Sequence, residues 1–123
     1  MQAARDADVG PLQALIDELE FNAVVAKYAE RDEQGCLFLD EQFRRAMRAG
    51  AIATLHETLK QSILEAYVAI DRANQWVSAV LNHLRGSIPW GESADAAARA
   101  IAKAETKIQN ARDALLQFLG SEV

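Results

Sequence analysis

The feature that most constrains the fold is a seven-residue repeat of apolar side chains between Ile63 and Leu84. Apolar residues recur there at alternating intervals of three and four, which places them on one stripe of an α-helix. The stripe consists of Ile63, Ala66, Ile70, Ala73, Val77, Val80 and Leu84. Because the pattern holds for three heptads and alternates large with small residues, it is typical of a coiled-coil seam that another backbone approaches closely.

A second segment near the C-terminus has the same spacing. Its stripe consists of Ala97, Ile101, Ala104, Ile108, Ala111, Leu115 and Phe118. The apolar positions of the two segments align, as they would in an internal repeat. We favour the simpler interpretation that two helices packed on each other need the same spacing, because two units are too few to define a repeat array. The intervening GSIPWGES contains two glycines and a proline, which interrupt helices. A short connection makes neighbouring helices antiparallel, so we predict a hairpin whose second helix has Ser93 as its N-cap.

The composition fits one all-α domain. The chain has 123 residues, half of them apolar, with only two prolines and six glycines. We therefore predict an all-α antiparallel helical bundle, or coiled-coil hairpin, built on one long central helix. Residues 1–10 are expected to be a flexible N-terminal tail and residues 11–120 a single helical-bundle domain. Gly10-Pro11 is expected to open the first helix, because proline suits the first helical position.

The long central helix is expected to run from Glu41 to Arg85, with Asp40 as its N-cap. Gly50 is the only interruption, and no proline or cap residue stands beside it. A glycine inside a helix costs about 1 kcal/mol relative to alanine, which a long helix can absorb. We therefore expect one continuous or slightly bent helix of roughly 65 Å. The short apolar segment Cys36–Leu39 is expected to cover the end of the core.

The charge is unevenly placed and argues against nucleic-acid binding. The net charge is −5, and the first 33 residues contain eight acidic and three basic side chains, so the remainder is neutral. No strong basic field is left for a phosphate backbone. Arg44, Arg45 and Arg48 are interpreted as a solvated face or as partners of the acidic first helix. The polar N-terminal sequence and the lack of a long apolar run lead us to expect a cytoplasmic protein with no membrane partner.

The sequence contains no pattern typical of catalysis, and we expect no cofactor, no metal and no enzymatic activity. Di-iron, zinc, phosphate-loop, dinucleotide and nucleophile-elbow motifs are all absent. Cys36 is the only cysteine, which excludes an internal disulfide and any multi-cysteine metal site. Asp17, Glu18 and Glu20 resemble the acidic helices of all-α nucleotide pyrophosphatases, but no second helix has the paired Glu-x-x-Glu spacing. We interpret them as a solvated acidic face.

The segment LHETLKQSIL around His56 resembles histidine phosphotransfer domains, whose phosphorylated histidine stands in His-x-Leu-Lys-Gly-Ser. Leu59 and Lys60 fall one position late here, and Gln61 replaces the glycine. A phosphotransfer histidine must face solvent, whereas His56 lies seven residues before Ile63, which predicts a polar seam residue that tunes register. Exposure of His56 therefore separates a phosphotransfer relay from a binding module.

Apolar residues outside the two seams indicate a partner. The first helix is apolar on several sides, the long helix has further apolar residues beside its seam, and Trp90 either closes the bundle end or meets a partner. The predicted partner-binding residues are Phe21, Val25, Tyr28, Leu64, Val68, Trp76 and Trp90. We predict a non-enzymatic protein–protein interaction or assembly module, of the kind of a small bacterial or phage adaptor, inhibitor or chaperone. It is expected to bind another protein and to form a helical homo-oligomer, with a homodimer favoured. The alternatives are the phosphotransfer relay and a ligand-binding bundle with a cavity between its alanine layers.

Overall fold

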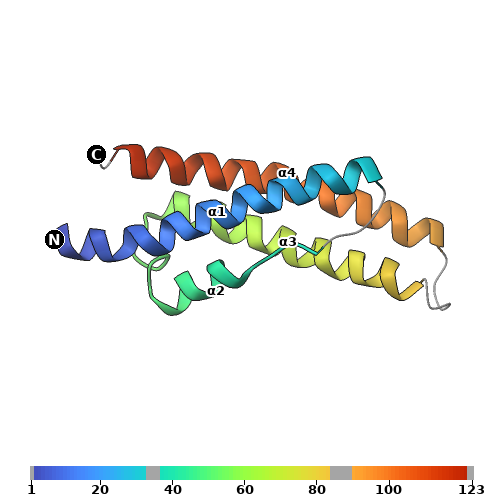
Figure 1. Ribbon diagram of the computed structural model, residues 1–123, viewed down its shortest axis with the longest axis horizontal. Helices are drawn as coiled ribbons and strands as arrows, with labels where there is room; N and C mark the ends of the chain where they lie inside the picture. The colour runs from blue at the N-terminus through green and yellow to red at the C-terminus, as the bar shows by residue number, and fades with distance from the viewer. Residues whose placement is uncertain (1, 33–36, 84–89, 122–123) are drawn as a thin grey trace.

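The computed structural model describes residues 2–32, 37–83 and 90–121 of the chain. This part contains four helices and no strand: α1 (Gln2–Asp32), α2 (Glu41–Arg48), α3 (Glu57–His83) and α4 (Trp90–Ser121). The three long helices lie side by side, and the short α2 lies across one flank (Figure 1). The predicted all-α helical bundle is confirmed.

The two heptad segments pack against each other as antiparallel helices α3 and α4 (Figure 1). Their stripes form the seam, because Ile63, Ile70, Ile108 and Leu115 are all essentially inaccessible to solvent. The intervening alanines Ala66, Ala73, Ala104 and Ala111 are also fully buried. Helix α4 begins at Trp90, so the prediction that Ser93 is its N-cap was wrong. Most of the predicted connection lies outside the described residues.

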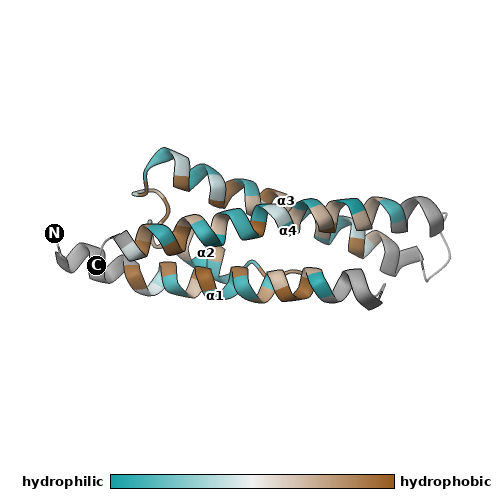
Figure 2. Cartoon of the chain, turned by 90° about the horizontal axis from the view of Figure 1, so that it is seen from above, coloured by the Kyte–Doolittle hydropathy of each residue, from teal (hydrophilic) through white to brown (hydrophobic). Residues whose placement is uncertain are grey.

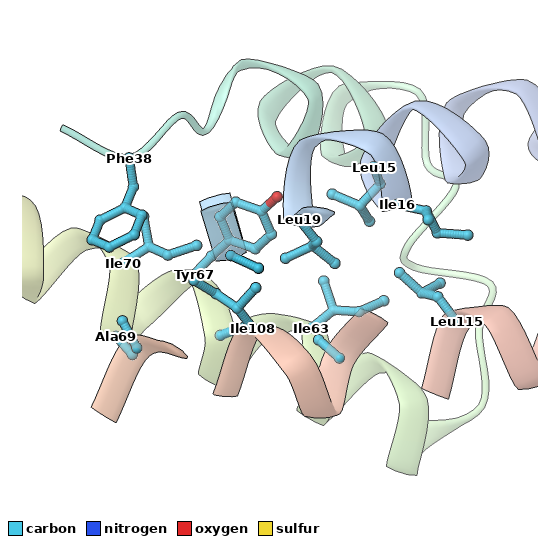
Figure 3. Close-up of a cluster of buried hydrophobic side chains, with 14 of the residues drawn as sticks. Leu15, Ile16, Leu19, Phe38, Ile63, Tyr67, Ala69, Ile70, Ile108 and Leu115 are labelled. Carbon is cyan, nitrogen blue, oxygen red and sulfur yellow. The ribbon is translucent and has the colours of Figure 1, made fainter. Parts of the chain in front are cut away.

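Helix α1 packs along α4 and against α2, and its side chains meet those of α3 in the core (Figure 3). The buried stripe consists of Leu12, Leu15, Ile16, Leu19, Ala23 and Ala26. The helix begins at Gln2 and contains Pro11, so the prediction that Gly10-Pro11 opens it was wrong. Proline removes one backbone hydrogen bond, but the apolar stripe that begins at Leu12 keeps the segment on the core. That residues 1–10 form a flexible N-terminal tail stays a prediction.

The continuous long helix was also a wrong prediction, because α2 ends at Arg48 and α3 begins only at Glu57. Gly50 has a φ of +78°, the left-handed conformation that glycine adopts most readily. The Gly50 N–H donates to the Met47 carbonyl and the Ala51 N–H to the Ala46 carbonyl, at 3.2 and 3.0 Å. These two bonds form a Schellman motif, which ends a helix at a left-handed glycine. The turns that follow bury Ala51, Ile52 and Leu55 in the core.

The segment before α2 has no regular structure, and Phe38 anchors it. The ring of Phe38 is buried and lies over Ile70 of α3 (Figure 3), whereas Leu37 and Leu39 are exposed. Among the described residues of this segment, the Phe38 side chain covers the core, and the Leu37 and Leu39 side chains do not. Cys36 lies outside the described residues. No helix within the described ranges has the length and apolar character needed to cross a membrane.

Candidate functional site

A groove of about 640 Å³ runs between α3 and α4. Seven of its lining residues come from α3 and five from α4: Gln61, Leu64, Glu65, Val68, Ala69, Arg72 and Trp76, and Ala96, Arg99, Ala100, Lys103 and Lys107. Within each helix these residues recur at intervals of mostly three and four, so each set forms one stripe along its helix. We call this feature the α3–α4 groove.

The α3–α4 groove lies on the side of the helix pair that is turned away from α1. On α3 its residues stand about half a turn from the buried stripe that contains Ile63, Ile70 and Val77. Seen from above in Figure 2, α1 follows one side of the pair formed by α3 and α4. The α3–α4 hairpin therefore has one side covered by its own chain and one side open to solvent.

The floor of the groove is apolar and unusually exposed. Val68 is 55% exposed and Trp76, about two turns further along α3, is 43% exposed, while Leu64, one turn before Val68, is half-buried. On the α4 side the small residues Ala96 and Ala100 keep the surface hollow. Exposed large apolar side chains on one stripe of a helix cost solvation free energy in an isolated chain, and such stripes often mark a binding site.

The rim of the groove is basic, although the chain as a whole is acidic. The lining contains four basic residues and one acidic residue, a net charge of +3, in a chain of net charge −5. Lys107 forms an ion pair with Glu65 at 3.1 Å, which bridges α4 and α3. Arg72, Arg99 and Lys103 are exposed and form no ion pair with any residue in the described ranges. Three cations therefore stand free around an apolar floor.

The structure brings together three of the predicted partner-binding residues, Leu64, Val68 and Trp76, in this groove. Phe21 is half-exposed on the outer face of α1, away from the groove. Val25, which is 9% exposed, belongs to the buried core cluster. Tyr28 lies within α1 and Trp90 is the first residue of α4, and the side chains of both lie outside what the structure describes.

His56 is exposed, so the prediction that it lies on the buried seam was wrong. The residue directly precedes α3, and its Nδ1 accepts a hydrogen bond of 3.3 Å from the Leu59 backbone N–H. This is the geometry of an N-cap, which satisfies one of the free N–H groups at a helix start. The imidazole also makes an edge-on contact with Phe118 of α4, at 6.1 Å between ring centroids.

A buried polar network holds α2 against α1 and α3, and sequence reasoning missed it. Glu18 of α1 is only 5% exposed. One of its carboxylate oxygens accepts a hydrogen bond from the Gln42 backbone N–H at 2.8 Å. The other accepts from the Phe43 backbone N–H at 3.2 Å and from the Tyr67 hydroxyl at 2.7 Å. The carboxylate thus caps the start of α2 from another helix, where a negative charge is favourable.

Two earlier interpretations change as a result. Glu18 is not part of a solvated acidic face, although Asp17 and Glu20 are exposed as predicted. Asp40 precedes α2, but its side chain makes no cap hydrogen bond and pairs instead with Arg44 at 3.0 Å. Burial, followed by the hydrogen bond to Glu18, raises the pKa of the Tyr67 phenol far above its usual range.

Two asparagines fix the extended segment before α2. The side-chain amide of Asn22 donates to the Leu39 carbonyl and accepts from the Leu39 N–H, both at 2.8 Å. Asn74 of α3 accepts from the Phe38 N–H at 2.7 Å and donates to the Phe38 carbonyl at 3.1 Å. Each amide therefore pairs with both polar groups of one residue, as a neighbouring strand would. The available signal was a polar residue on an otherwise apolar helical stripe.

The described residues contain no group of three or more histidine, cysteine, aspartate or glutamate side chains that could hold a metal ion. Within the described residues no buried side-chain nitrogen or oxygen lacks a hydrogen-bond partner, and neither Glu18 nor Tyr67 lines the α3–α4 groove. Comparisons with protein-family models, curated proteins and solved structures find no match to this chain. The α3–α4 groove is therefore the candidate site, on physical grounds.

Proposed function

We propose that this chain is a non-enzymatic protein–protein interaction module whose α3–α4 groove binds a helix of a partner protein. The observation that carries the proposal is the exposure of Val68 and Trp76 beside the small residues of α4. An apolar groove between two neighbouring antiparallel helices is a shape into which the apolar face of an amphipathic helix fits. Trp76 is the expected anchor, because tryptophan is enriched among residues that dominate binding energies.

The architecture supports this proposal. Four-helix bundles bury both sides of a helical hairpin, whereas α1 covers one side of the α3–α4 hairpin here. The short α2 lies beside α1 and contributes no residue to the groove. A partner helix in the groove would take the place of the fourth long helix of a four-helix bundle. Its binding would remove Val68 and Trp76 from water.

The proposal is tested by comparing the proteins retained from the native host by the wild-type chain and by Val68→Asp. An aspartate at position 68 opposes binding because a charge in the apolar floor must be desolvated when the partner docks, a cost that Arg72 one turn away offsets only in part. Leu116→Asp is the matched control, since Leu116 is likewise an aliphatic residue that is about half-exposed on a helix, but it lies outside the groove. We expect a specific protein to be retained by wild type and Leu116→Asp and lost with Val68→Asp. Equal retention by all three, or no retention by wild type, contradicts the proposal.

The exposure of His56 favours one second candidate, a histidine phosphotransfer-type relay. The imidazole is open to solvent at the start of α3, as phosphoryl transfer requires, although its Nδ1 is engaged as a helix cap. The test is incubation with a phosphorylated response regulator and detection of phosphohistidine, with His56→Gln as the control. Labelling that is absent from the wild-type chain eliminates this candidate.

A further inference from the structure

The outer side of α1 presents a second surface whose chemistry is opposite to that of the groove. Phe21 and Val24 are each 50% exposed, and Asp17 and Glu20 flank them on the same side of the helix. These four residues define the acidic face of α1. Neither Asp17 nor Glu20 forms an ion pair with any residue of the described ranges. Asp17 accepts a hydrogen bond of 3.2 Å from the Gln13 side-chain amide, which leaves its charge uncompensated, so the acidic face combines an apolar centre with uncompensated negative charge.

The two surfaces are complementary in both charge and apolarity. The groove offers Val68 and Trp76 as an apolar floor and Arg99 and Lys103 as free cations, on one helix pair. The acidic face offers Phe21 and Val24 between two carboxylates, on a regular helix. We propose that the acidic face of α1 of one copy of this chain docks in the α3–α4 groove of another copy. This inference rests on the proposed function and names the partner helix.

Charge decides against the two symmetric ways of pairing these surfaces. If two grooves faced each other, the unpaired Arg72, Arg99 and Lys103 of one copy would meet the same cations of the other. If two acidic faces met, Asp17 and Glu20 would oppose their own counterparts. Placing like charges across an interface is strongly unfavourable, whereas opposite charges favour both the encounter and the register. Only the unlike pair of surfaces brings unpaired cations to unpaired carboxylates.

The placement of the two surfaces also fixes the symmetry of the assembly. Phe21 and Val24 are exposed on the side of α1 opposite its buried stripe, and the groove lies on the side of α3 and α4 turned away from α1, which follows the other side of that pair (Figure 2). Two copies cannot therefore engage both surfaces with each other at once. Each copy keeps one surface free for a third copy, and such head-to-tail contacts produce a closed ring or an open filament. The assembly grows beyond the dimer that the sequence suggested.

The test is sedimentation velocity of the full chain from micromolar to near-millimolar concentration, with two charge-reversed variants. The groove variant is Arg99→Glu with Lys103→Glu, and the α1 variant is Asp17→Lys with Glu20→Lys. We expect wild type to form species larger than a dimer, with self-association that weakens as salt rises, because rim charges are screened. Each variant by itself is expected to associate at least tenfold more weakly.

Mixing the two variants is the decisive arm. In an equimolar mixture, the reversed α1 of one variant meets the reversed groove of the other, and the unreversed surfaces also match. We therefore expect the mixture to regain wild-type association, although each component by itself associates at least tenfold more weakly. The control is Arg45→Glu with Arg48→Glu on α2, which lowers the net charge by the same amount as the groove variant but outside the groove, and should associate like wild type. Circular dichroism verifies that every variant keeps its helical content.

A monomeric wild type at the highest concentration, an assembly that stops at a dimer, or a mixture that stays monomeric overturns the proposal. The outcome is distinguishable from failure of the proposed function. If the chain stays monomeric while Val68→Asp still abolishes retention of a different protein, the groove binds that protein and only the head-to-tail assembly is refuted. If Val68→Asp also leaves retention unchanged, both proposals are refuted.

Discussion

Replacing Glu18 with alanine removes a side chain that joins α1, α2 and α3 through polar contacts. The substitution leaves three donors without their acceptor: the backbone N–H groups of Gln42 and Phe43 and the buried hydroxyl of Tyr67. Loss of a helix cap costs about 1–2 kcal/mol, and leaving a buried hydroxyl unsatisfied costs about 1–3 kcal/mol. Because the two N–H groups are only partly buried and can reach water, we expect a total loss near 3 kcal/mol.

The free energy of unfolding is measured by urea denaturation followed by circular dichroism. A destabilisation of about 3 kcal/mol corresponds to a melting temperature lower by roughly 10 °C or more in a chain of this size. Hydrogen exchange localises the effect: the Gln42 and Phe43 amides should exchange faster, while those of the α3–α4 seam change only with global stability. Glu20→Ala is the matched control, because Glu20 lies two residues away on the exposed side of α1 and should change stability by about 0.5 kcal/mol or less.

A double-mutant cycle with Tyr67→Phe tests whether the network acts as a unit. Tyr67→Phe by itself is expected to destabilise the fold by about 1 kcal/mol. The substitution loses one hydrogen bond to a carboxylate, but it also removes the cost of burying the hydroxyl. In the Glu18→Ala background it should cost nothing or restore stability, because the hydroxyl is already unsatisfied there. The expected coupling energy is about 1–2 kcal/mol. Additive losses, within about 0.5 kcal/mol, would refute the assignment of Glu18 as a buried cap.

Three further outcomes follow from the structure. The pKa of the Tyr67 phenol is raised above its unfolded-state value of about 10. The folded state therefore keeps its full stability below about pH 10 and loses stability as the pH rises further, because only the unfolded chain then releases this proton. In urea titrations, wild type should lose about 1.4 kcal/mol more of its free energy of unfolding than Tyr67→Phe for each pH unit above about 10. Gly50→Ala should destabilise by about 1–2 kcal/mol because of the left-handed φ, whereas Gly10→Ala, in a helix with open space around the position, should be neutral or stabilising in the same thermal melts. Asn74→Ala should cost about 2–3 kcal/mol, since it frees both polar groups of Phe38, and equal protection of the Phe38 amide in variant and wild type would contradict this.

The seam of α3 and α4 could be predicted because its signal is local and repeated. Ile63, Ile70, Ile108 and Leu115 stand at helical spacing, and any helix with that spacing must cover its stripe. The exposed Val68 and Trp76 were recognisable for the same reason, as apolar residues off the stripe. Which basic residues stand beside them was not recognisable, because Arg99 and Lys103 reach the groove only when α4 folds back on α3.

The break after α2 could not be predicted from the propensity of Gly50 alone. A glycine inside a helix costs only about 1 kcal/mol relative to alanine. A continuous helix and a helix that ends at Gly50 in a Schellman motif are therefore close in local free energy. The observed ending is the Schellman motif, and the turns after it bury Ala51, Ile52 and Leu55, so packing of the core rather than local propensity decides between them. The same break removes His56 from the seam and makes it a cap.

The sequence by itself determined that the chain is helical, where its two longest apolar stripes lie and that some apolar residues stay outside them, because these properties depend on spacing within one helix. Tertiary structure alone decided that Glu18 is a buried cap, that the chain turns at Gly50 and that a basic rim surrounds an apolar groove. Each of those outcomes depends on which side chains from distant parts of the chain share the same low-dielectric interior or the same surface, and that proximity is a property of packing.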